Sequence, residues 1–290
     1  MARLTSAAND IVRAGRDIAK SQAMEVRIVG LVQNADDRLT LATRLAAHTD
    51  SGIATVKALG PHSVKDVAEA DVAIIVVRDP TDPTVSERVD AVAARRRNTY
   101  VVALGSATEA LDRVAAEIGV RASMVVCSPH GDVIPDELAD RVVKAMAERK
   151  YALAAAFPVF RPAAVASVIS ATSWQNAAVA TFLGVPGADM PVLTANQIKM
   201  VLEIAAVYGE TIGFERAKEI LAVVAGGFTL RTIAREALGF VPGPGWLLKG
   251  GIAYSGTVAI GKAAERYFAL GPDGRAGLAS RLRRRLPQKT

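Results

Sequence analysis

The chain has 290 residues, of which 51% are hydrophobic and only 5% aromatic, and its formal net charge is +6. This length allows two domains with cores of their own, and the hydrophobic share excludes a largely disordered chain. The single cysteine, Cys127, excludes an internal disulfide, and charges at Asp10, Arg13 and Arg16 argue against an apolar signal segment, so we expect a cytoplasmic protein.

Residues 1–23 are expected to form an N-terminal helix, after which strands and helices alternate through residues 24–150. Short runs rich in β-branched residues predict strands at 25–32, 53–59, 72–77, 100–104 and 123–127. Helices are expected between and after them at 38–47, 85–96, 108–118 and 135–148. Continuously apolar strands are typical of a sheet covered on both faces, so the sequence predicts a doubly wound, mainly parallel α/β domain.

The loop after the first strand is the first place to look for a ligand, because such folds bind ligands at the carboxyl ends of their strands. A phosphate loop, GxxxxGK[ST], needs a second glycine, a lysine for the phosphates and a hydroxyl for magnesium. Aligned on Gly30, these positions hold Ala35, Asp36 and Asp37. Two carboxylates would repel a triphosphate, so the phosphate loop is lost. Both suit the first turn of the next helix instead.

Two later loops also lack nucleotide motifs. Residues 103–108 read Ala-Leu-Gly-Ser-Ala-Thr where a small GTPase would carry Asn-Lys-x-Asp, and Ser128 after the last strand is the one serine kept in a plausible place. The order and spacing of elements over residues 24–150 nevertheless resemble a small G domain. The resemblance therefore implies a degenerate, GTPase-like domain, a pseudo-GTPase.

Other groups of reactive residues are sparse. The three histidines, at 48, 62 and 130, lack the short spacings of a zinc site, and Cys127 at a strand end is expected to be a small buried hydrophobe. We therefore expect no metal, no cofactor and no catalytic residue. Residues 78–83 contain two prolines and predict a rigid turn, although they could also line a cleft.

From Tyr151 the strand patterns end, which predicts an all-α domain over residues 151–272 and a basic tail over 273–290. Thr194 and Gln197 have the spacing of a capping box and predict a helix start. Further helices are expected at 214–224, 230–238 and 245–270, the last with glycines that permit close packing.

Several short motifs in this half are shared with a known family. They are Pro186-Gly187-Ala188-Asp189, then Gln197 and Met200 ahead of Ala205-Ala206-Val207-Tyr208-Gly209, and Thr257-Val258-Ala259-Ile260-Gly261 before Tyr267-Phe268. Over residues 155–270 the chain is similar to the YcjF-like helical domain, domain of unknown function family 697. In bacteria that domain often follows an Era-like GTPase domain. The resemblance implies an all-helical module on or near a membrane, and the missing phosphate loop argues against GTP switching.

Four residues of the helical half are candidate contacts for a ligand or partner. Asp189 is the one acidic residue between Arg161 and Glu203, although it could simply cap a turn. Gln197 is a candidate besides its capping role. Tyr254 and Thr257, three residues apart on one helix face, could line an internal cavity, and ordinary packing explains them equally well.

Residues 162–183 are uncharged, and about 20 predominantly apolar residues suffice to span a membrane. Seven polar side chains make the segment only mildly hydrophobic, so a buried bundle helix and a membrane-associated helix both stay open. The tail predicts a contact with an anionic surface, through Arg281, Arg283, Arg284 and Arg285. A solvated terminus is the alternative, and nucleic acid is the least favoured partner.

These observations predict a non-catalytic scaffold or adaptor of pseudo-GTPase type rather than an enzyme. Its expected partners are another protein, a second copy or an anionic membrane surface. We expect it in the cytoplasm, with peripheral or integral attachment at the inner face of the cell membrane left open. The alternative is a nucleotide-binding regulator or GTPase-related enzyme with a non-standard phosphate site, built from Ser106, Thr108 or Ser128.

Overall fold

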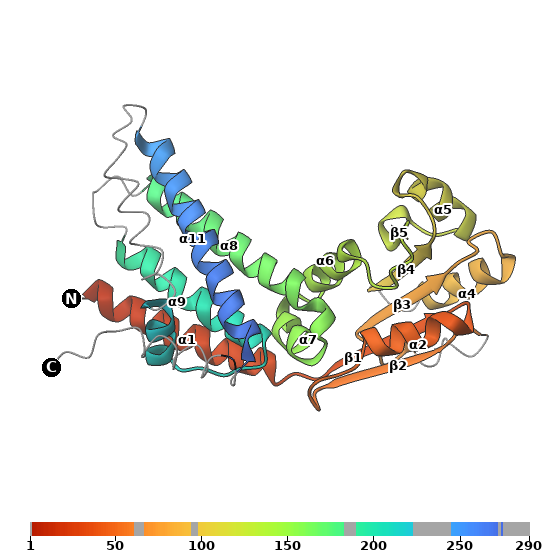
Figure 1. Ribbon diagram of the computed structural model, residues 1–290, viewed down its shortest axis with the longest axis horizontal. Helices are drawn as coiled ribbons and strands as arrows, with labels where there is room; N and C mark the ends of the chain where they lie inside the picture. The colour runs from red at the N-terminus through yellow and green to blue at the C-terminus, as the bar shows by residue number, and fades with distance from the viewer. Residues whose placement is uncertain are drawn as a thin grey trace. The chain divides into compact units, whose positions relative to one another are not determined.

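The computed structural model describes residues 2–60, 67–93, 98–182, 190–222, 245–271 and 274. Contacts divide the chain into two compact units (Figure 1). We call Ser21–Ala164 the α/β domain, and Met1–Lys20 together with Val165–Thr290 the helical unit.

The α/β domain contains one sheet of five strands in the order β2-β1-β3-β4-β5, all of them parallel. The strands are β1 (Val26–Val32), β2 (Gly52–Ala58), β3 (Val72–Val77), β4 (Thr99–Leu104) and β5 (Val125–Ser128). Each lies within two residues of its predicted position. The predicted fold class, a parallel α/β sheet followed by helices, is confirmed.

Helices cover the sheet as the apolar strand runs predicted. They are α2 (Ala35–Arg44), α4 (Pro83–Ala93), α5 (Leu111–Ile118) and α6 (Asp136–Ala145), with short 3-10 turns at Thr108–Ala110 (η1) and Ala122–Met124 (η2). All six residues of β3 are buried. On one face, Ile75 and Val77 share a core with Val89 of α4 and Ile118 of α5. Burial on both faces explains why this strand shows no polar alternation.

The helix boundaries of the α/β domain lie within three residues of the prediction. Helix α2 begins three residues earlier than expected because Asn34 caps it, its Oδ1 accepting from the Asp36 N–H at 3.1 Å. The predicted helix 108–118 is a 3-10 turn followed by α5.

The α/β domain continues beyond α6 through η3 (Ala147–Arg149), α7 (Lys150–Ala156) and η4 (Pro158–Phe160). Phe157 and Phe160 are fully buried. The His48 N–H donates to the Ala156 carbonyl oxygen at 2.7 Å, and a Cβ added to Gly52 would lie 2.6 Å from the Ala156 Cβ. Helix α7 therefore packs directly against the first residue of β2.

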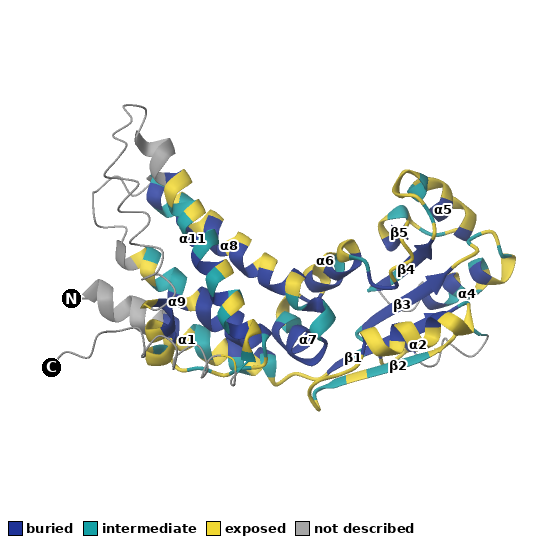
Figure 2. Cartoon of the chain, in the orientation of Figure 1, coloured by how far each residue is buried: buried dark blue, intermediate teal, exposed yellow. Residues whose placement is uncertain are grey.

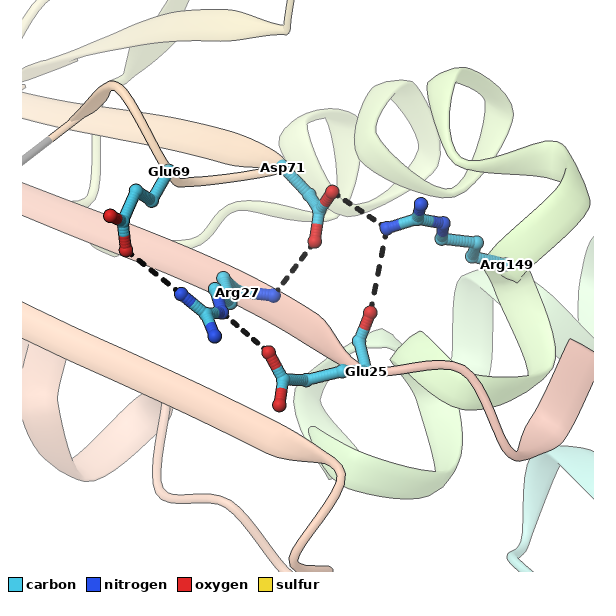
Figure 3. A network of polar contacts seen from close by, with 5 residues as sticks. All are labelled: Glu25, Arg27, Glu69, Asp71 and Arg149. Atoms are coloured by element: carbon cyan, nitrogen blue, oxygen red, sulfur yellow. Dashed lines mark hydrogen bonds and ion pairs between the residues drawn. The ribbon is translucent and has the colours of Figure 1, made fainter.

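A polar network also links this segment to the amino ends of the strands (Figure 3). Arg149 donates to Asp71 at 2.7 Å and to the Glu25 carbonyl oxygen at 3.4 Å, while Asp71 accepts from the Arg27 N–H at 2.9 Å. The Arg27 guanidinium pairs with Glu25 and Glu69. These contacts lie at the edge opposite the one where a ligand is expected.

The helices of the helical unit include α1 (Ala2–Gln22), α8 (Arg161–Phe182), α9 (Met190–Val207) and α11 (Gly245–Ala269), and residues 214–222 are also helical. A Cβ added to Gly261 would lie 2.6 Å from Ile169, and one added to Gly250 would collide with Thr181. Helices α8 and α11 are therefore antiparallel and in close contact through their small residues (Figure 1).

The predicted helix start at Thr194 is wrong. Helix α9 begins at Met190, so Thr194 and Gln197 lie inside it and form no cap. Pro191 falls in the first turn, where a missing N–H is tolerated, and the helix therefore extends through this proline.

Several predictions fall on residues outside the described ranges. They are the helix at 230–238, Asp189, and the tail with Arg281, Arg283, Arg284 and Arg285. In the described part of the chain, α8 included, no helix combines the length and apolarity needed to span a membrane.

Candidate functional site

The place in the α/β domain where a ligand would be expected lies between the carboxyl ends of β1 and β3. The order β2-β1-β3-β4-β5 reverses there, because β1 has β2 on one side and β3 on the other. In open parallel sheets the loops diverge at such a point and leave a crevice. We call the residues that follow these two strands the switch-point loops.

An ion pair joins the switch-point loops. Asp37, in the first turn of α2, is 4% exposed. Arg78, directly after β3, donates to both carboxylate oxygens of Asp37, from Nε at 2.8 Å and from Nη2 at 2.6 Å. These hydrogen bonds and the charge of Asp37 raise the pKa of Arg78 above its ordinary value. The pair is bidentate, the strongest geometry for an arginine and a carboxylate.

Gln33 adds a second connection between these loops. Its Oε1 accepts from the main-chain N–H groups of Arg78 at 2.8 Å and Asp79 at 3.0 Å. Its Nε2 donates to Asp82 at 3.2 Å, and its own N–H donates to the Val76 carbonyl oxygen at 2.9 Å. The Gln33 side chain thus occupies two main-chain N–H groups that could otherwise donate to an anion at this edge of the sheet.

The loop after β3 forms a turn, as its prolines predicted, and side-chain hydrogen bonds hold it. Asp79 Oδ1 accepts from the N–H and the hydroxyl of Thr81, at 2.9 and 2.6 Å. Asp82 Oδ1 accepts from the Thr84 N–H at 2.9 Å in the first turn of α4, which begins at Pro83. Hydrogen bonds from Thr84 lower the pKa of Asp82 below its ordinary value.

The chemistry of the switch-point loops follows from these contacts. Where a phosphate loop would offer free amides, a lysine and a hydroxyl, this chain has the Asn34 cap and two carboxylates, Asp36 and Asp37. The guanidinium of Arg78 is engaged by Asp37 at two of its nitrogens. The prediction that Asp36 and Asp37 occupy the first turn of a helix is confirmed.

The other candidate residues at this edge of the sheet follow β4 or lie at the end of β5. Ser128 and Cys127 are 3% and 5% exposed, and desolvation raises the pKa of the Cys127 thiol. Ser106 is half-buried and Thr108 is exposed. Among the described residues, no three histidine, cysteine, aspartate or glutamate side chains gather as metal ligands would.

The helical unit contains a second constellation, which we call the polar seam: Asn176 of α8, Asn196 of α9 and Thr257 of α11. Asn176 and Thr257 are 0% and 1% exposed. Asn176 donates to the Thr257 hydroxyl at 2.9 Å and accepts from Asn196 at 2.8 Å, and Thr257 donates to the Ala253 carbonyl oxygen at 2.7 Å. The seam links three helices through their side chains.

Thr257 was a candidate from the sequence, whereas the two asparagines were not. Asparagine is unfavourable in the middle of a helix, so its presence there could have indicated from the sequence that these two side chains have a specific role. Tyr254 packs against Trp174 with ring centroids 5.0 Å apart, and Gln197 is half-buried in the middle of α9.

Ser173 lies one turn before Asn176 on α8. It is 0% exposed, and its hydroxyl oxygen has no hydrogen-bond partner among the described residues.

Comparison with known families places one part of the chain. Residues 147–235 match the model of a domain of unknown function, DUF697. The matched stretch begins after the last strand and includes η3, α7, η4, α8 and α9. No curated protein matches the chain. This stretch of the chain is therefore similar to DUF697. The sequence motifs at residues 186–189 and 197–209 lie within it, and those at 257–261 and 267–268 lie beyond it.

Proposed function

We propose that the protein is a non-catalytic adaptor in which a degenerate, GTPase-like α/β domain accompanies a DUF697-type helical module. The observation that carries the proposal is that side chains of the switch-point loops bond to one another, Arg78 to Asp37 and Gln33 to the main chain after β3. A triphosphate entering there would have to displace Arg78 from Asp37 and break the hydrogen bonds of Gln33. It would then face the buried carboxylate of Asp37 without the lysine that normally neutralises the phosphates.

Nucleotide titration tests this proposal. Full-length protein is titrated calorimetrically with Mg²⁺-GTP, Mg²⁺-GDP and Mg²⁺-ATP to about 1 mM, and its unfolding temperature is recorded in parallel. We expect no saturable heat and no shift beyond that caused by MgCl₂ and NaCl of equal ionic strength. A micromolar dissociation constant would contradict the proposal, because about 100-fold excess ligand adds roughly 2.7 kcal/mol of stability, a shift of several degrees.

The same titration tests the alternative, a nucleotide-binding regulator or GTPase-related enzyme. That reading rests on the exposed position of Thr108 and the half-buried position of Ser106 after β4. If a nucleotide binds, Ser106→Ala and Thr108→Ala should weaken it, whereas Ser167→Ala on α8 should not.

The helical unit is the proposed contact with larger partners. Side chains exposed along α8 bear no charge, and they include Ser167, Ser170, Ala171, Trp174 and Ala178. Trp174 is 66% exposed, which is unusual for so large an apolar ring. We propose that this face and the basic tail, Arg281, Arg283, Arg284 and Arg285, bring the adaptor to an anionic membrane surface as a peripheral protein.

Flotation with vesicles tests the membrane contact. We expect binding to vesicles with anionic lipid, little binding to neutral vesicles, and release at about 0.5 M NaCl, because salt screens the tail charges. A Trp246→Phe variant leaves Trp174 as the one tryptophan, and its emission should shift to the blue on binding. Absence of flotation would remove the membrane from the proposal, and retention after an alkaline carbonate wash would show insertion.

A further inference from the structure

Strand β2 is the outermost strand on one side of the sheet. It pairs with β1 and with no other strand of the described chain (Figure 2). Main-chain hydrogen bonds on either side of this pairing run from the Val26 N–H to the Ser51 oxygen and from the Leu59 N–H to the Val32 oxygen, both at 2.8 Å. Main-chain groups alternate in direction along a strand, so those at odd-numbered positions of β2 face β1. The N–H and C=O groups of Ala54 and Val56 therefore point away from the sheet.

Most of this edge lacks the usual protection against pairing with another chain. Natural sheets protect their edges with charged side chains, proline, a bulge or a very short strand. Residues 52–56 read Gly-Ile-Ala-Thr-Val, without charge or proline, and their register with β1 runs without a bulge. Lys57, near the end of β2, is the one charged residue of the strand. The opposite edge strand, β5, has only four residues, all buried. Strand β2 is thus a ready template for a further strand.

A groove runs along the same edge, between β2 and the end of α2. Its volume is about 390 Å³. The lining residues are uncharged: Ala42, Leu45, Ala46, Ala47, Gly52, Ile53, Ala54 and Val56. Leu45 is buried, and Ile53 is 41% exposed. The groove therefore offers an apolar surface to side chains that a paired strand would project at every second residue.

Two kinds of strand could pair with this edge, and the groove distinguishes between them. A second copy paired through its own β2 would bring Gly52, Ala54 and Val56 to the groove, side chains no larger than valine. Gly52 and Ala54 would contribute little side-chain volume to a groove of about 390 Å³. A segment with branched apolar residues at alternate positions would satisfy the main-chain groups and fill the groove as well.

We propose that β2 and this groove are a docking site for an extended, uncharged segment of a partner protein, which adds to the sheet as a sixth strand. The site would give the proposed adaptor a protein partner. The docking site rests on the proposed function only in that an adaptor needs a partner, because the groove does not include the switch-point loops. Nucleotide binding in the titration would contradict the proposed function and leave the docking site standing. Absence of peptide binding would overturn the docking site and leave the proposed function standing.

Peptide binding to the full-length protein tests the docking site. The probe is the peptide KTVTVTVK, and the control is KTVTPTVK, whose proline removes a main-chain donor and breaks the alternation. Amide hydrogen exchange is followed by NMR. With KTVTVTVK in millimolar excess, the Ala54 and Val56 amides should exchange at least about tenfold more slowly, and KTVTPTVK should leave them unchanged. Unchanged exchange with both peptides would overturn the proposal.

Two protein variants locate the binding. Val56→Lys places a charge in the groove and should weaken KTVTVTVK binding at least about tenfold. Thr55→Lys makes the same change on the other face of the strand and should retain binding. Equal binding by both variants would overturn the proposal, and if Val56→Lys does not fold, the two-peptide comparison on the unaltered protein decides. Dimeric protein whose Ala54 and Val56 amides are protected without peptide would assign the edge to a second copy and also overturn it.

Discussion

At the scale of single residues, the ion pair between Arg78 and Asp37 joins two partners with unequal exposure. The side chain of Asp37 is 6% exposed and that of Arg78 is 52% exposed. An unpaired guanidinium in this position can be hydrated, whereas an unpaired carboxylate beneath it cannot. The two partners should therefore contribute unequally when each is removed.

We predict that Arg78→Ala lowers the free energy of unfolding by about 2–3 kcal/mol, because it leaves a buried carboxylate uncompensated. Asp37→Ala should cost only about 1 kcal/mol, since it leaves a half-exposed arginine in contact with water. Urea denaturation of both variants measures the difference. Equal losses of stability, or a larger loss for Asp37→Ala, would show that leaving the Asp37 carboxylate unpaired is not the main cost.

The same pair illustrates what sequence reasoning could and could not reach. Asp36 and Asp37 were expected at a helix start from the loop pattern alone, and they lie there. The partner of Asp37 is 41 residues away in sequence, and no local pattern connects Arg78 with it. Gln33 was overlooked for the same reason, because its contacts are with a loop that only the sheet order brings close.

At the scale of elements, the polar seam joins α8, α9 and α11 through hydrogen bonds between their side chains. Buried hydrogen bonds between helices contribute little to net stability but penalise any register that leaves them unpaired. Asn176 is the central member, since it bonds to both Thr257 and Asn196.

We predict that Asn176→Ala lowers the stability of the helical unit by about 2–3 kcal/mol, through the lost hydrogen bonds and the cavity left behind. Ser173→Ala is the matched control on the same helix, and it should be neutral or stabilising by up to about 1 kcal/mol, because that buried hydroxyl has no partner. Both variants introduce alanine into α8, so the helix propensity of the new residue is the same in each. Denaturation followed by circular dichroism checks them, and a loss for Ser173→Ala as large as that for Asn176→Ala would contradict this account.

The glycines of α11 should likewise divide into two classes. A Cβ at Gly261 would meet Ile169 at 2.6 Å, whereas one at Gly256 would have nothing within 4 Å. Gly261→Ala should therefore cost about 1–3 kcal/mol by forcing α8 and α11 apart. Gly256→Ala should stabilise by about 0.5–1 kcal/mol, because alanine is the better helix former. Thermal unfolding of the two variants, with shifts of opposite sign, is the measurement.

At the scale of the whole molecule, sequence and structure place the end of the α/β domain at different residues. The sequence places the end of that domain near residue 150, where strand patterns stop, whereas contacts continue it to Ala164. Leu153, Phe157 and Phe160 are fully buried, although all three follow the last strand by more than twenty residues.

Two fragments distinguish these boundaries. We predict that residues 21–164 fold by themselves with a cooperative urea transition. A fragment of residues 21–150 should lack such a transition, because each missing buried side chain removes about 1.5–3 kcal/mol from a domain with a net stability of about 5–15 kcal/mol. NMR amide dispersion provides an independent readout. Equal transition midpoints for the two fragments would place the boundary near residue 150.

The sequence by itself determined the α/β fold class, the positions of five strands, the absence of a GxxxxGK[ST] pattern after the first strand, and the similarity of part of the second half of the chain to a known domain. These depend on local periodicity and on residue types at fixed spacing, which any stretch of chain carries within itself. Tertiary structure decided which polar groups meet: Arg78 with Asp37, and Asn176 with Thr257 and Asn196. It also decided that β2 lies at an open edge beside an apolar groove. Such pairings arise only when segments tens of residues apart are brought together by packing, and no local pattern encodes them.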